Sequence, residues 1–405
     1  MSPRTLRVTL SGDDRPGVTH TLLSAVAEAN AQVLDLEQMV VRDHLTLSVL
    51  LAGPDPDALT SLAHAVGHRL GMRTRTRAGV GDSTAPRDGR AHVVALGRPL
   101  TARGLAAVTA RIAAHGANID RIRRLSHYPV TTIELDVSGA DVPRLRTELA
   151  GVAASERLDV AVAPAGLARI GSRLVVMDVD STFIQQEVIE LIAAHAGCEE
   201  QVAAVTERAM RGELDFAESL RARVALLAGL PVSVLDEVRA QIVLTPGART
   251  LVRTLKRLGD TVALVSGGFI EIVAPIAAEL GIDHAVANRL EVADGHLTGR
   301  VDGPIVDRAA KAAALRRFAD EAGLPLSRTV AIGDGANDLD MLAAAGLGVA
   351  FNAKPLVRAQ ADTSVTVPYL DAVLFLLGIT REDVEAADAD TGSTSWQAVA
   401  GDRRH

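Results

Sequence analysis

The 405-residue chain contains a single cysteine, Cys198, and few aromatic residues, which make up 2% of the composition. A single cysteine excludes a disulfide bond within the chain and indicates a reducing compartment. With so few aromatic side chains, the hydrophobic cores must consist of Ala, Val, Leu and Ile. Long basic runs are missing too, and the net charge is −8. We therefore expect neither nucleic acid nor an anionic membrane surface as a partner.

The sequence also lacks an uncharged apolar run of about 18 residues, which a membrane-spanning helix needs, and its first residues contain no apolar signal core. Hydrophobic residues make up 48% and charged residues 23%, which is typical of folded globular domains. The length exceeds the roughly 100–200 residues of a usual domain, so two to four domains are expected. We predict a soluble, cytoplasmic, multidomain protein.

The first part of the chain contains one pattern twice, with a period of about 85 residues. Residues 4–80 are predicted to form a strand, a helix, two strands and a helix, and residues 91–165 repeat this order and add a final strand. HTLLSAVAEANAQVLDLEQ and AAVTARIAAHGANIDRIRR occupy matching places. Between the copies, RAGVGDSTAPRDGRA is rich in Gly, Pro, Ser and Asp and is predicted to be a linker. The pattern indicates two α+β units of the βαββαβ type.

From Gly171 onward, short apolar runs alternate with helical segments, which is typical of a parallel sheet covered by helices. The runs are RLVVMDV, DTVALVS, RTVAIGD, LGVAFN and TSVTV. Between the first two lies a helical insertion, about residues 185–244, which is too long for a simple crossover and is predicted to be a cap. The polar segment 381–405 is predicted to be a flexible tail.

Polar residues follow several of these runs. Because ligands of open α/β sheets bind beyond the carboxyl ends of the strands, these residues are expected to converge. They are Asp178, Asp180 and Thr182 at the end of the first run, Ser266, Gly267 and Gly268 at the end of the second, and Asp334, Asn337 and Asp338 at the end of RTVAIGD. Lys311 lies in the helix that precedes RTVAIGD. Each set alone has a simpler explanation as a helix cap, a tight turn, a solvated loop or a surface lysine. Their recurrence at successive strand ends indicates a site.

The residue types at these strand ends suit phosphoryl transfer. Crowded carboxylates raise one another's pKa, and a divalent ion with oxygen ligands, usually Mg²⁺ next to a phosphate, relieves this. Ser266, the backbone N–H of Gly267 and Lys311 supply donors for phosphate oxygens. One carboxylate can attack phosphorus, and a second can transfer the proton of the leaving oxygen.

Other motifs fit these residues poorly. A calcium loop beginning at Asp178 would need Gly and Glu at its sixth and twelfth positions, where the chain has Phe183 and Ile189. A P-loop is absent, and GDGAND lacks the spacing of a dinucleotide-binding fingerprint.

With these motifs assembled, residues 171–380 resemble phosphatases of the haloacid dehalogenase superfamily in all four of its motifs. The resemblance implies a Rossmann-like parallel-sheet core with a helical cap, in which Asp178 is the nucleophile and Asp180 the general acid and base. It also implies that Asp178, the main-chain carbonyl of Asp180 and Asp334 hold Mg²⁺, with Asp338 in support. Two other branches of the superfamily fit less well. The dehalogenase branch lacks an acid at the place of Asp180, which favours hydrolysis of a phosphate here, and the ion-pumping ATPase branch needs membrane helices, which this sequence lacks.

The same resemblance implies a substrate-binding set. It consists of Thr182, Ser266, Gly267, Lys311 and Asn337. Two further stretches, DVDSTFIQQEVIELIAAHAG and TERAMRGELDFAESLRARVALLAGLP, resemble phosphoserine phosphatases.

In that family a glutamate receives the substrate ammonium, which here corresponds to Glu187, and a cap arginine pairs with the substrate carboxylate, here Arg223. Met210 and Phe216 match the apolar residues of the cap. Without the resemblance, Glu187 is a helix-start acid and Arg223 belongs to a solvated helix face. The resemblance therefore implies Mg²⁺-dependent hydrolysis of O-phospho-L-serine to L-serine and phosphate, the last step of L-serine biosynthesis.

The two repeats resemble ACT domains, small modules that often bind amino acids. The loop GDDRPG, Gly12 to Gly17, matches the ligand loop of that family, whereas GRPLTARG in the second copy is a weaker match. The resemblance implies a regulatory L-serine site near Asp14 and Gly17 and a homodimer. Alternatively, both repeats serve only dimerisation. The expected domain bounds are 1–82, 90–167 and 171–380.

Three other functions stay open at this point. The first is hydrolysis of another small phosphate, such as a phosphorylated amino alcohol or sugar. The second is an amino-acid sensor with a vestigial phosphatase module, against which the complete set Asp178, Asp180, Lys311 and Asp334 argues. The third is phosphotransfer to an alcohol instead of water.

Overall fold

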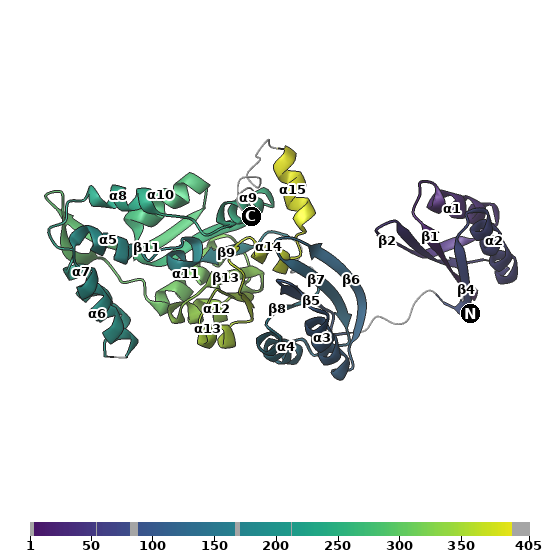
Figure 1. Cartoon of the computed structure of the whole chain (residues 1–405), viewed down its shortest axis with the longest axis horizontal. Coiled ribbons are helices and arrows are strands. Elements are labelled where there is room, and N and C mark those ends of the chain that lie inside the picture. Colours follow the sequence, from purple (N-terminus) through teal and green to yellow (C-terminus); the bar gives the residue numbers. More distant parts are fainter. Residues whose placement is uncertain (1–3, 54, 82–87, 167–170, 212, 391–405) are drawn as a thin grey trace, which may run out of the picture. The chain divides into compact units, whose positions relative to one another are not determined.

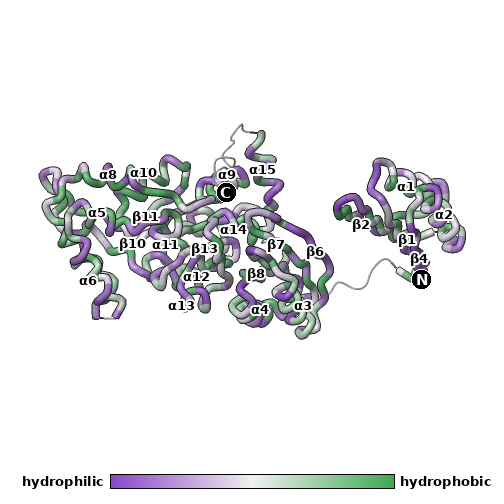
Figure 2. Tube along the Cα trace, in the orientation of Figure 1, coloured by the Kyte–Doolittle hydropathy of each residue, from purple (hydrophilic) through white to green (hydrophobic). Residues whose placement is uncertain are grey.

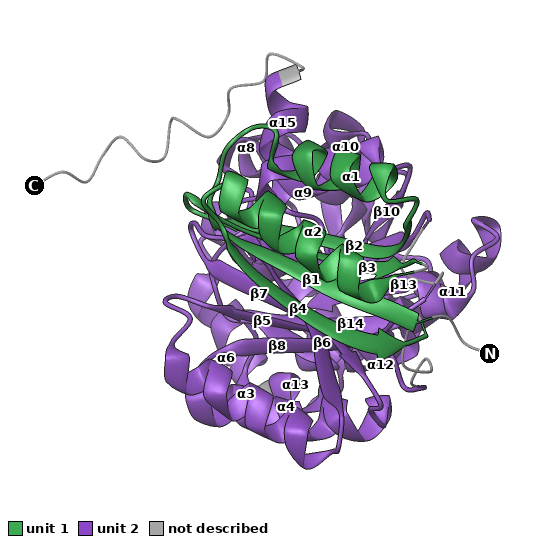
Figure 3. Cartoon of the chain, turned by 90° about the vertical axis from the view of Figure 1, so that its right-hand side faces the viewer, with its two compact units in different colours: residues 1–86 green, residues 87–405 purple. Residues whose placement is uncertain are grey.

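The computed structural model describes residues 4–53, 55–81, 88–166, 171–211 and 213–390. The chain forms two compact units, Met1–Pro86 and Arg87–His405 (Figure 3). Among the described residues, no helix combines the length and the hydropathy that crossing a membrane requires. The predicted domain bounds stay predictions, since residues 82–87 and 167–170 lie outside the described ranges.

The first unit is a βαββαβ fold with an antiparallel sheet of strand order β2-β3-β1-β4. Its elements are β1 (Arg4–Asp13), α1 (Val18–Glu28), β2 (Gln32–Val41), β3 (His44–Ala52), α2 (Pro56–Arg69) and β4 (Arg73–Val80). Successive side chains of a strand point to opposite faces, and Leu6, Val8 and Leu10 of β1 all pack into the core that the two helices cover.

The sequence pattern did not identify β4, and its last residues were assigned to the linker. This assignment is wrong for residues 77–80, because β4 pairs with β1 along its whole length. The strand is an edge strand whose exposed Arg73, Arg75 and Arg77 alternate with Thr. It therefore lacks the apolar alternation that reveals a half-buried strand.

The second repeat has the same topology, with strand order β6-β7-β5-β8, which confirms the predicted duplication. Its elements are β5 (Ala91–Gly97), α3 (Ala102–Ala114), β6 (Asn118–Ser126), β7 (Thr131–Ser138), α4 (Val142–Glu156) and β8 (Asp159–Pro164). Val93 packs under its own helices, whereas Val94 and Leu96 belong to the core of the following domain. Both faces of β5 are therefore buried.

The third region contains a parallel sheet of strand order β12-β11-β10-β9-β13-β14-β15, in which only β12 runs antiparallel to its neighbour. The strands are β9 (Leu174–Met177), β10 (Thr261–Phe269), β11 (His284–Ala293), β12 (His296–Asp302), β13 (Thr329–Gly333), β14 (Leu347–Phe351) and β15 (Thr363–Val365). Figure 2 shows hydrophobic segments along these strands and alternating colours along the surrounding helices. The five predicted runs correspond to β9, β10, β13, β14 and β15. Prediction missed β11 and β12, which form a hairpin in which most residues are at least partly exposed.

Helices cover both faces of this sheet, because side chains of β9 point alternately to two separate cores. The helices are α9 (Ala248–Arg257), α10 (Ile270–Leu280), α11 (Arg308–Glu321), α12 (Leu339–Ala344), α13 (Pro355–Gln360), α14 (Ala372–Leu376) and α15 (Arg381–Asp390). Between β9 and β10 the chain forms the cap (Figure 1). It contains α5 (Val188–Ala196), α6 (Glu199–Met210), α7 (Phe216–Ala225) and α8 (Val234–Gln241).

The flexible tail predicted from Arg381 is wrong for the segment that forms α15. Arg253 Nη2 and Arg257 Nη1 of α9 lie 2.5 and 2.7 Å from the carboxylate of Asp388, which is buried. At the other end of the helix, the guanidinium of Arg381 lies 5.8 Å from the ring centre of Tyr128 in the second repeat. Ionic contacts with distant residues thus order a segment whose composition is polar. Residues 391–405 lie outside the described ranges.

Candidate active site

A cavity of about 600 Å³ lies between the carboxyl ends of the parallel strands and the cap. Strands β9, β10 and β13 are adjacent in the sheet, so the residues that follow them meet at one edge. The predicted residues that line the cavity are Asp178, Asp180, Glu187, Phe216, Arg223, Gly267, Asp334 and Asn337. The convergence expected from the strand ends is therefore present.

Lys311 lies beneath the cavity, in the first turns of α11. Its Nζ lies 2.5 Å from Asp178 Oδ1 and 2.7 Å from Asp338 Oδ1, and all three side chains are buried. The helix starts there because the Asp307 carboxylate caps it, accepting a hydrogen bond from the Ala310 N–H at 2.8 Å. Burial lowers the pKa of Lys311, but the two carboxylates raise it above its usual value. The ammonium group therefore remains protonated.

The carboxylates at this edge outnumber the single lysine. Oxygens of Asp178, Asp334 and Asp338 lie within 4.8 Å of one another. Burial raises the pKa of Asp178, and the neighbouring carboxylates raise it further, against the opposing charge of Lys311. The pKa of Asp334 is raised to about 6 by burial and by Asp338 and Glu187, although Thr182 Oγ1 donates to its Oδ1 at 2.8 Å. Such a cluster fits a hard divalent cation with oxygen ligands.

The carboxylate of Asp338 is already engaged on both oxygens. Oδ1 accepts from Lys311, and Oδ2 accepts from the Gly335 N–H at 3.0 Å. This arrangement suits a residue that supports the loop after β13, whereas Asp178 and Asp334 line the cavity itself.

Asp180 is held from two sides. Its Oδ2 accepts from Ser266 Oγ at 2.9 Å at the end of β10, and its Oδ1 accepts from the Val188 N–H at 2.8 Å at the start of α5. Burial raises the pKa of Asp180 to about 6, and the charge of Glu187 contributes to the shift. A carboxyl group of this kind exchanges a proton near neutral pH, and it links the core to the cap.

Glycines allow the end of β10 to approach these groups. A Cβ atom on Gly268 would lie 2.8 Å from Asp180 Oδ2, and one on Gly267 would lie 3.0 Å from the Phe216 ring. The Gly268 N–H donates to Ser266 Oγ at 2.7 Å, which orients the hydroxyl group. Side chains at these two positions would crowd Asp180 and Phe216, so the glycines favour the close packing of core, cap and Asp180.

The cap contributes charges of both signs. Glu187 precedes α5, and Ser181 Oγ donates to its Oε1 at 2.7 Å. Arg223 lies in α7, where its Nε donates to the Ser219 carbonyl at 3.3 Å. Burial lowers the pKa of Arg223, and Glu187 and Asp180 counteract this. Met210 is the last residue of α6, and its side chain lies outside the described residues.

The residues predicted to bind a regulatory ligand lie in the other unit. Asp14 and Gly17 belong to the exposed loop between β1 and α1, and the Asp14 N–H donates to the Asp43 carbonyl at 2.8 Å. Gly17 has φ 93°, a backbone conformation that residues with a side chain rarely adopt, and it begins the turn into α1.

Sequence reasoning missed two cations that line the cavity, Arg308 and Lys354. Lys354 follows β14, so the rule that located the other residues at strand ends could have found it. Arg308 opens α11 and its Nη2 lies 2.5 Å from Asp340 Oδ1, a contact that no local pattern signals. The hydrogen bond of Ser181 to Glu187 was not predicted either, although Ser181 lies inside the first motif.

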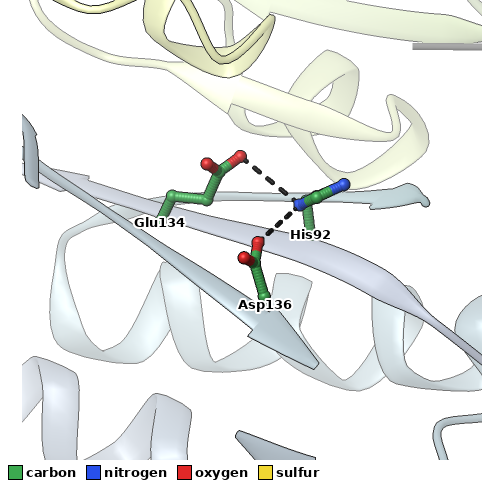
Figure 4. A group of neighbouring side chains, drawn as sticks. All are labelled: His92, Glu134 and Asp136. Atoms are coloured by element: carbon green, nitrogen blue, oxygen red, sulfur yellow. Dashed lines mark hydrogen bonds and ion pairs between the residues drawn. The ribbon is translucent and has the colours of Figure 1, made fainter. Parts of the chain in front are cut away.

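A second group of ligand-type side chains occurs in the described part of the chain, on β5 and β7 of the second repeat. His92 Nδ1 lies 2.7 Å from Asp136 Oδ1 and 3.6 Å from Glu134 Oε1 (Figure 4). Arg123 Nε donates to the other oxygen of Glu134 at 2.6 Å. Each carboxylate thus has a basic partner, and the group is an ion-pair network.

Comparison with known proteins gives the same domain arrangement. Residues 175–343 match the haloacid dehalogenase-like hydrolase family, and residues 4–76 and 90–163 each match an ACT domain. A phosphoserine phosphatase of Streptomyces coelicolor is 58% identical over 387 residues, which cover 95% of this chain and 94% of the relative. One from Mycobacterium tuberculosis is 53% identical, with coverage of 94% and 95%.

A crystal structure of a probable phosphoserine phosphatase from Vibrio cholerae, in its unliganded form, is also similar. It has 35% sequence identity and a TM-score of 0.57, and the match covers 78% of this chain and 93% of that chain. The similarity to the relatives thus extends over the ACT repeats as well as the hydrolase core. The chain belongs to the phosphoserine phosphatase family of haloacid dehalogenase-like hydrolases, with two ACT domains ahead of the hydrolase domain.

Proposed function

We propose that the chain hydrolyses O-phospho-L-serine to L-serine and phosphate through a phosphoryl group carried on Asp178. One observation carries this proposal: a single cavity holds Asp178 and Asp180 at the sheet edge and Glu187 and Arg223 on the cap. The ammonium and carboxylate groups of this phosphate monoester complement Glu187 and Arg223, and its phosphate would meet Asp178, the proposed nucleophile. The names of the two relatives identical over most of the chain support the same substrate.

In the first step, a carboxylate oxygen of Asp178 attacks phosphorus and forms the new P–O bond. The bond between phosphorus and the serine oxygen breaks, and its electron pair stays on that oxygen, which takes the proton of Asp180. Lys311 balances charge beside the nucleophile, and Ser266 Oγ keeps the Asp180 carboxyl group in place. Serine leaves with its hydroxyl group restored.

In the second step, Asp180 as carboxylate takes a proton from water. The water oxygen bonds to phosphorus, and the bond between phosphorus and the Asp178 oxygen breaks. Both aspartates thereby return to their starting states, with phosphate as the second product. Closure of the cap would exclude other nucleophiles from the cavity. Phe216 of the cap contributes to the cavity lining.

Asp178, Asp334 and the main-chain carbonyl of Asp180 would hold Mg²⁺, with Asp338 supporting the loop. Bound there, the ion would neutralise charge on the phosphoryl oxygens. The surplus of carboxylates over cations around Lys311 supports this assignment.

At the cap, Glu187 receives the ammonium group and the planar guanidinium of Arg223 pairs with the carboxylate in a bidentate manner. Ser266, the N–H of Gly267, Asn337, Thr182 and Lys311 form the phosphate side of the site. Phe216 and Met210 are assigned to the apolar lining of the cap.

The test is phosphate release with Mg²⁺ from O-phospho-L-serine and, in parallel, from phosphoethanolamine, which lacks the carboxylate. We expect fast release from phosphoserine alone, lost in EDTA. Arg223→Lys should lower kcat/KM for phosphoserine by about 10–100-fold, because the bidentate contact is lost, and leave phosphoethanolamine unchanged. Comparable release from both substrates would contradict the assignment of the cap residues. No release from either would favour a sensor with an inactive hydrolase module.

We also infer that L-serine binds at the loop containing Asp14 and Gly17 and regulates a homodimeric enzyme. The family match of residues 4–76 to an ACT domain supports this inference. L-Serine is titrated against activity in wild type, Gly17→Val and Asp14→Asn. An unchanged response in both variants would remove the regulatory site from this loop.

A further inference from the structure

Ser181 has a backbone conformation that its residue type rarely adopts. It lies in the tight turn Val179–Phe183 with φ 57° and ψ 1°. This left-handed region is uncommon for residues other than glycine and asparagine. The turn allows the neighbours on both sides to reach the site, since Asp180 contacts Ser266 and Thr182 contacts Asp334. The conformation therefore accounts for the direction of the chain, but a glycine would serve that purpose equally well.

The hydroxyl group of Ser181 has a specific partner. Its Oγ donates to Glu187 Oε1 at 2.7 Å, and the Ser181 N–H donates to the Gln186 carbonyl at 3.3 Å. Glu187 is exposed and precedes α5 without capping it through its side chain. A glutamate in such a position ordinarily samples several rotamers, and restricting them costs conformational entropy. A bond to one carboxylate oxygen restricts these rotamers and leaves the second oxygen able to accept from a ligand.

The backbone beside Glu187 is fixed from another direction. Gln186 Nε2 donates to the Gln241 carbonyl at 3.2 Å, and its Oε1 accepts from the Val243 N–H at 3.0 Å. These bonds join the two chain segments that connect the cap to the core. Glu187 is thus held through its backbone by Gln186 and through its side chain by Ser181.

We propose that Ser181 is a positioning residue that orients Glu187 toward a substrate ammonium group, and that it thereby sets the preference for phosphate monoesters carrying an amino group. The assignment rests on the proposed function, because it takes Glu187 as the group that receives the ammonium. Ser181 itself touches neither the phosphate nor the ester oxygen in this scheme. Its effect appears in the discrimination between substrates with and without the amino group.

The test compares kcat/KM for O-phospho-L-serine with that for 3-phosphonooxypropanoate, the same ester with hydrogen in place of the ammonium group. Ser181→Ala and Ser181→Gly both remove the hydroxyl, but only the glycine variant also relieves the backbone conformation. We expect the ratio of the two kcat/KM values to fall about tenfold in both variants, through a higher KM for phosphoserine. The values for 3-phosphonooxypropanoate should stay within about twofold of wild type.

Glu187→Gln serves as the matched background in which Ser181→Ala is tested again. Because Ser181 acts through Glu187, Ser181→Ala should lower the ratio no further once Glu187 is replaced. Equal losses for both substrates in Ser181→Ala, or an additional tenfold fall in the double variant, would overturn the positioning role. Thermal unfolding of each variant shows whether the fold is retained, and Ser181→Gly keeps the test informative if Ser181→Ala is unstable. If the proposed function is wrong, wild type shows no preference for phosphoserine, and the proposed role of Ser181 is then wrong too. If only the Ser181 proposal is wrong, wild type keeps this preference.

Discussion

Two groups of acidic side chains in this chain have similar composition and different surroundings. In the catalytic region, Asp178, Asp334 and Asp338 share one buried lysine and lie beside an open cavity. In the second ACT repeat, Glu134 and Asp136 lie on one strand, β7, with Arg123 and His92 on the strands at either side, and neither carboxylate lines the cavity of the catalytic region.

The difference lies in how charge is balanced. Carboxylates that serve only the fold are paired with cations of the chain, because an uncompensated buried charge costs several kcal/mol. The carboxylates proposed to serve chemistry are in excess over cations, and burial raises the pKa values of Asp178 and Asp334. An excess of negative charge beside a cavity therefore distinguishes the proposed cation site from the ion-pair network.

The largest effect is expected for Asp178→Asn. An amide cannot attack phosphorus, so phosphate release from phosphoserine should fall at least about 10⁴-fold. Circular dichroism should show a retained fold, because Asp338 still pairs with Lys311. Activity within tenfold of wild type would mean that another residue is the nucleophile.

The next effect concerns the cations. Lys311→Met leaves Asp178 and Asp338 buried without their partner and should lower the free energy of unfolding by about 3–5 kcal/mol. Arg123→Met in the second repeat is the matched comparison. It should cost less, about 1–3 kcal/mol, because the Arg123 side chain is half exposed and His92 remains beside Glu134. Urea denaturation at pH 7.5 without added metal measures both, and an inverted order would contradict the comparison.

A smaller effect follows from cation binding. Mg²⁺ at about 100 times its Kd should raise the free energy of unfolding by about 2.7 kcal/mol, through binding to the native state alone. Asp334→Asn should abolish the stabilisation, whereas His92→Asn should retain it. Thermal shifts with Mg²⁺ and Mn²⁺ provide the readout. Loss of the Mg²⁺ stabilisation in His92→Asn would indicate that the cation binds in the second repeat instead.

The smallest effect is expected for Asp136→Asn. The carboxylate is partly exposed and pairs with a partly exposed histidine, so its removal should change stability by about 0–1 kcal/mol and activity by less than about twofold. Phosphate release and urea denaturation measure the two quantities. A large loss of activity would connect this network to catalysis.

The sequence predicted the positions of Asp178, Ser266 and Asp334 well, because the carboxyl ends of parallel strands lie at one edge of a sheet whatever their separation along the chain. It predicted the outer strands of the sheets poorly. β4 presents arginines and threonines, and most residues of the β11–β12 hairpin are at least partly exposed, so apolar alternation is weak at the margin of a sheet.

Long-range ionic contacts were equally hidden. Asp388 pairs with Arg253 and Arg257, which are 135 and 131 residues away along the chain, and no local pattern contains this information. The His92 network depends on the register between β5 and β7, in which His92 lies opposite Asp136. The contact between Ser181 Oγ and Glu187 depends on how the turn after β9 folds, which residue type alone does not reveal.

The most direct test of the account is to locate the phosphoryl group. The enzyme is mixed with O-phospho-L-serine and Mg²⁺ and quenched in acid, and any acyl phosphate is then reduced with borohydride, which converts a phosphorylated aspartate to homoserine. Peptide mass spectrometry identifies the position. The account predicts homoserine at position 178 in wild type and none in Asp178→Asn. Homoserine at another position, or turnover without any, would contradict it.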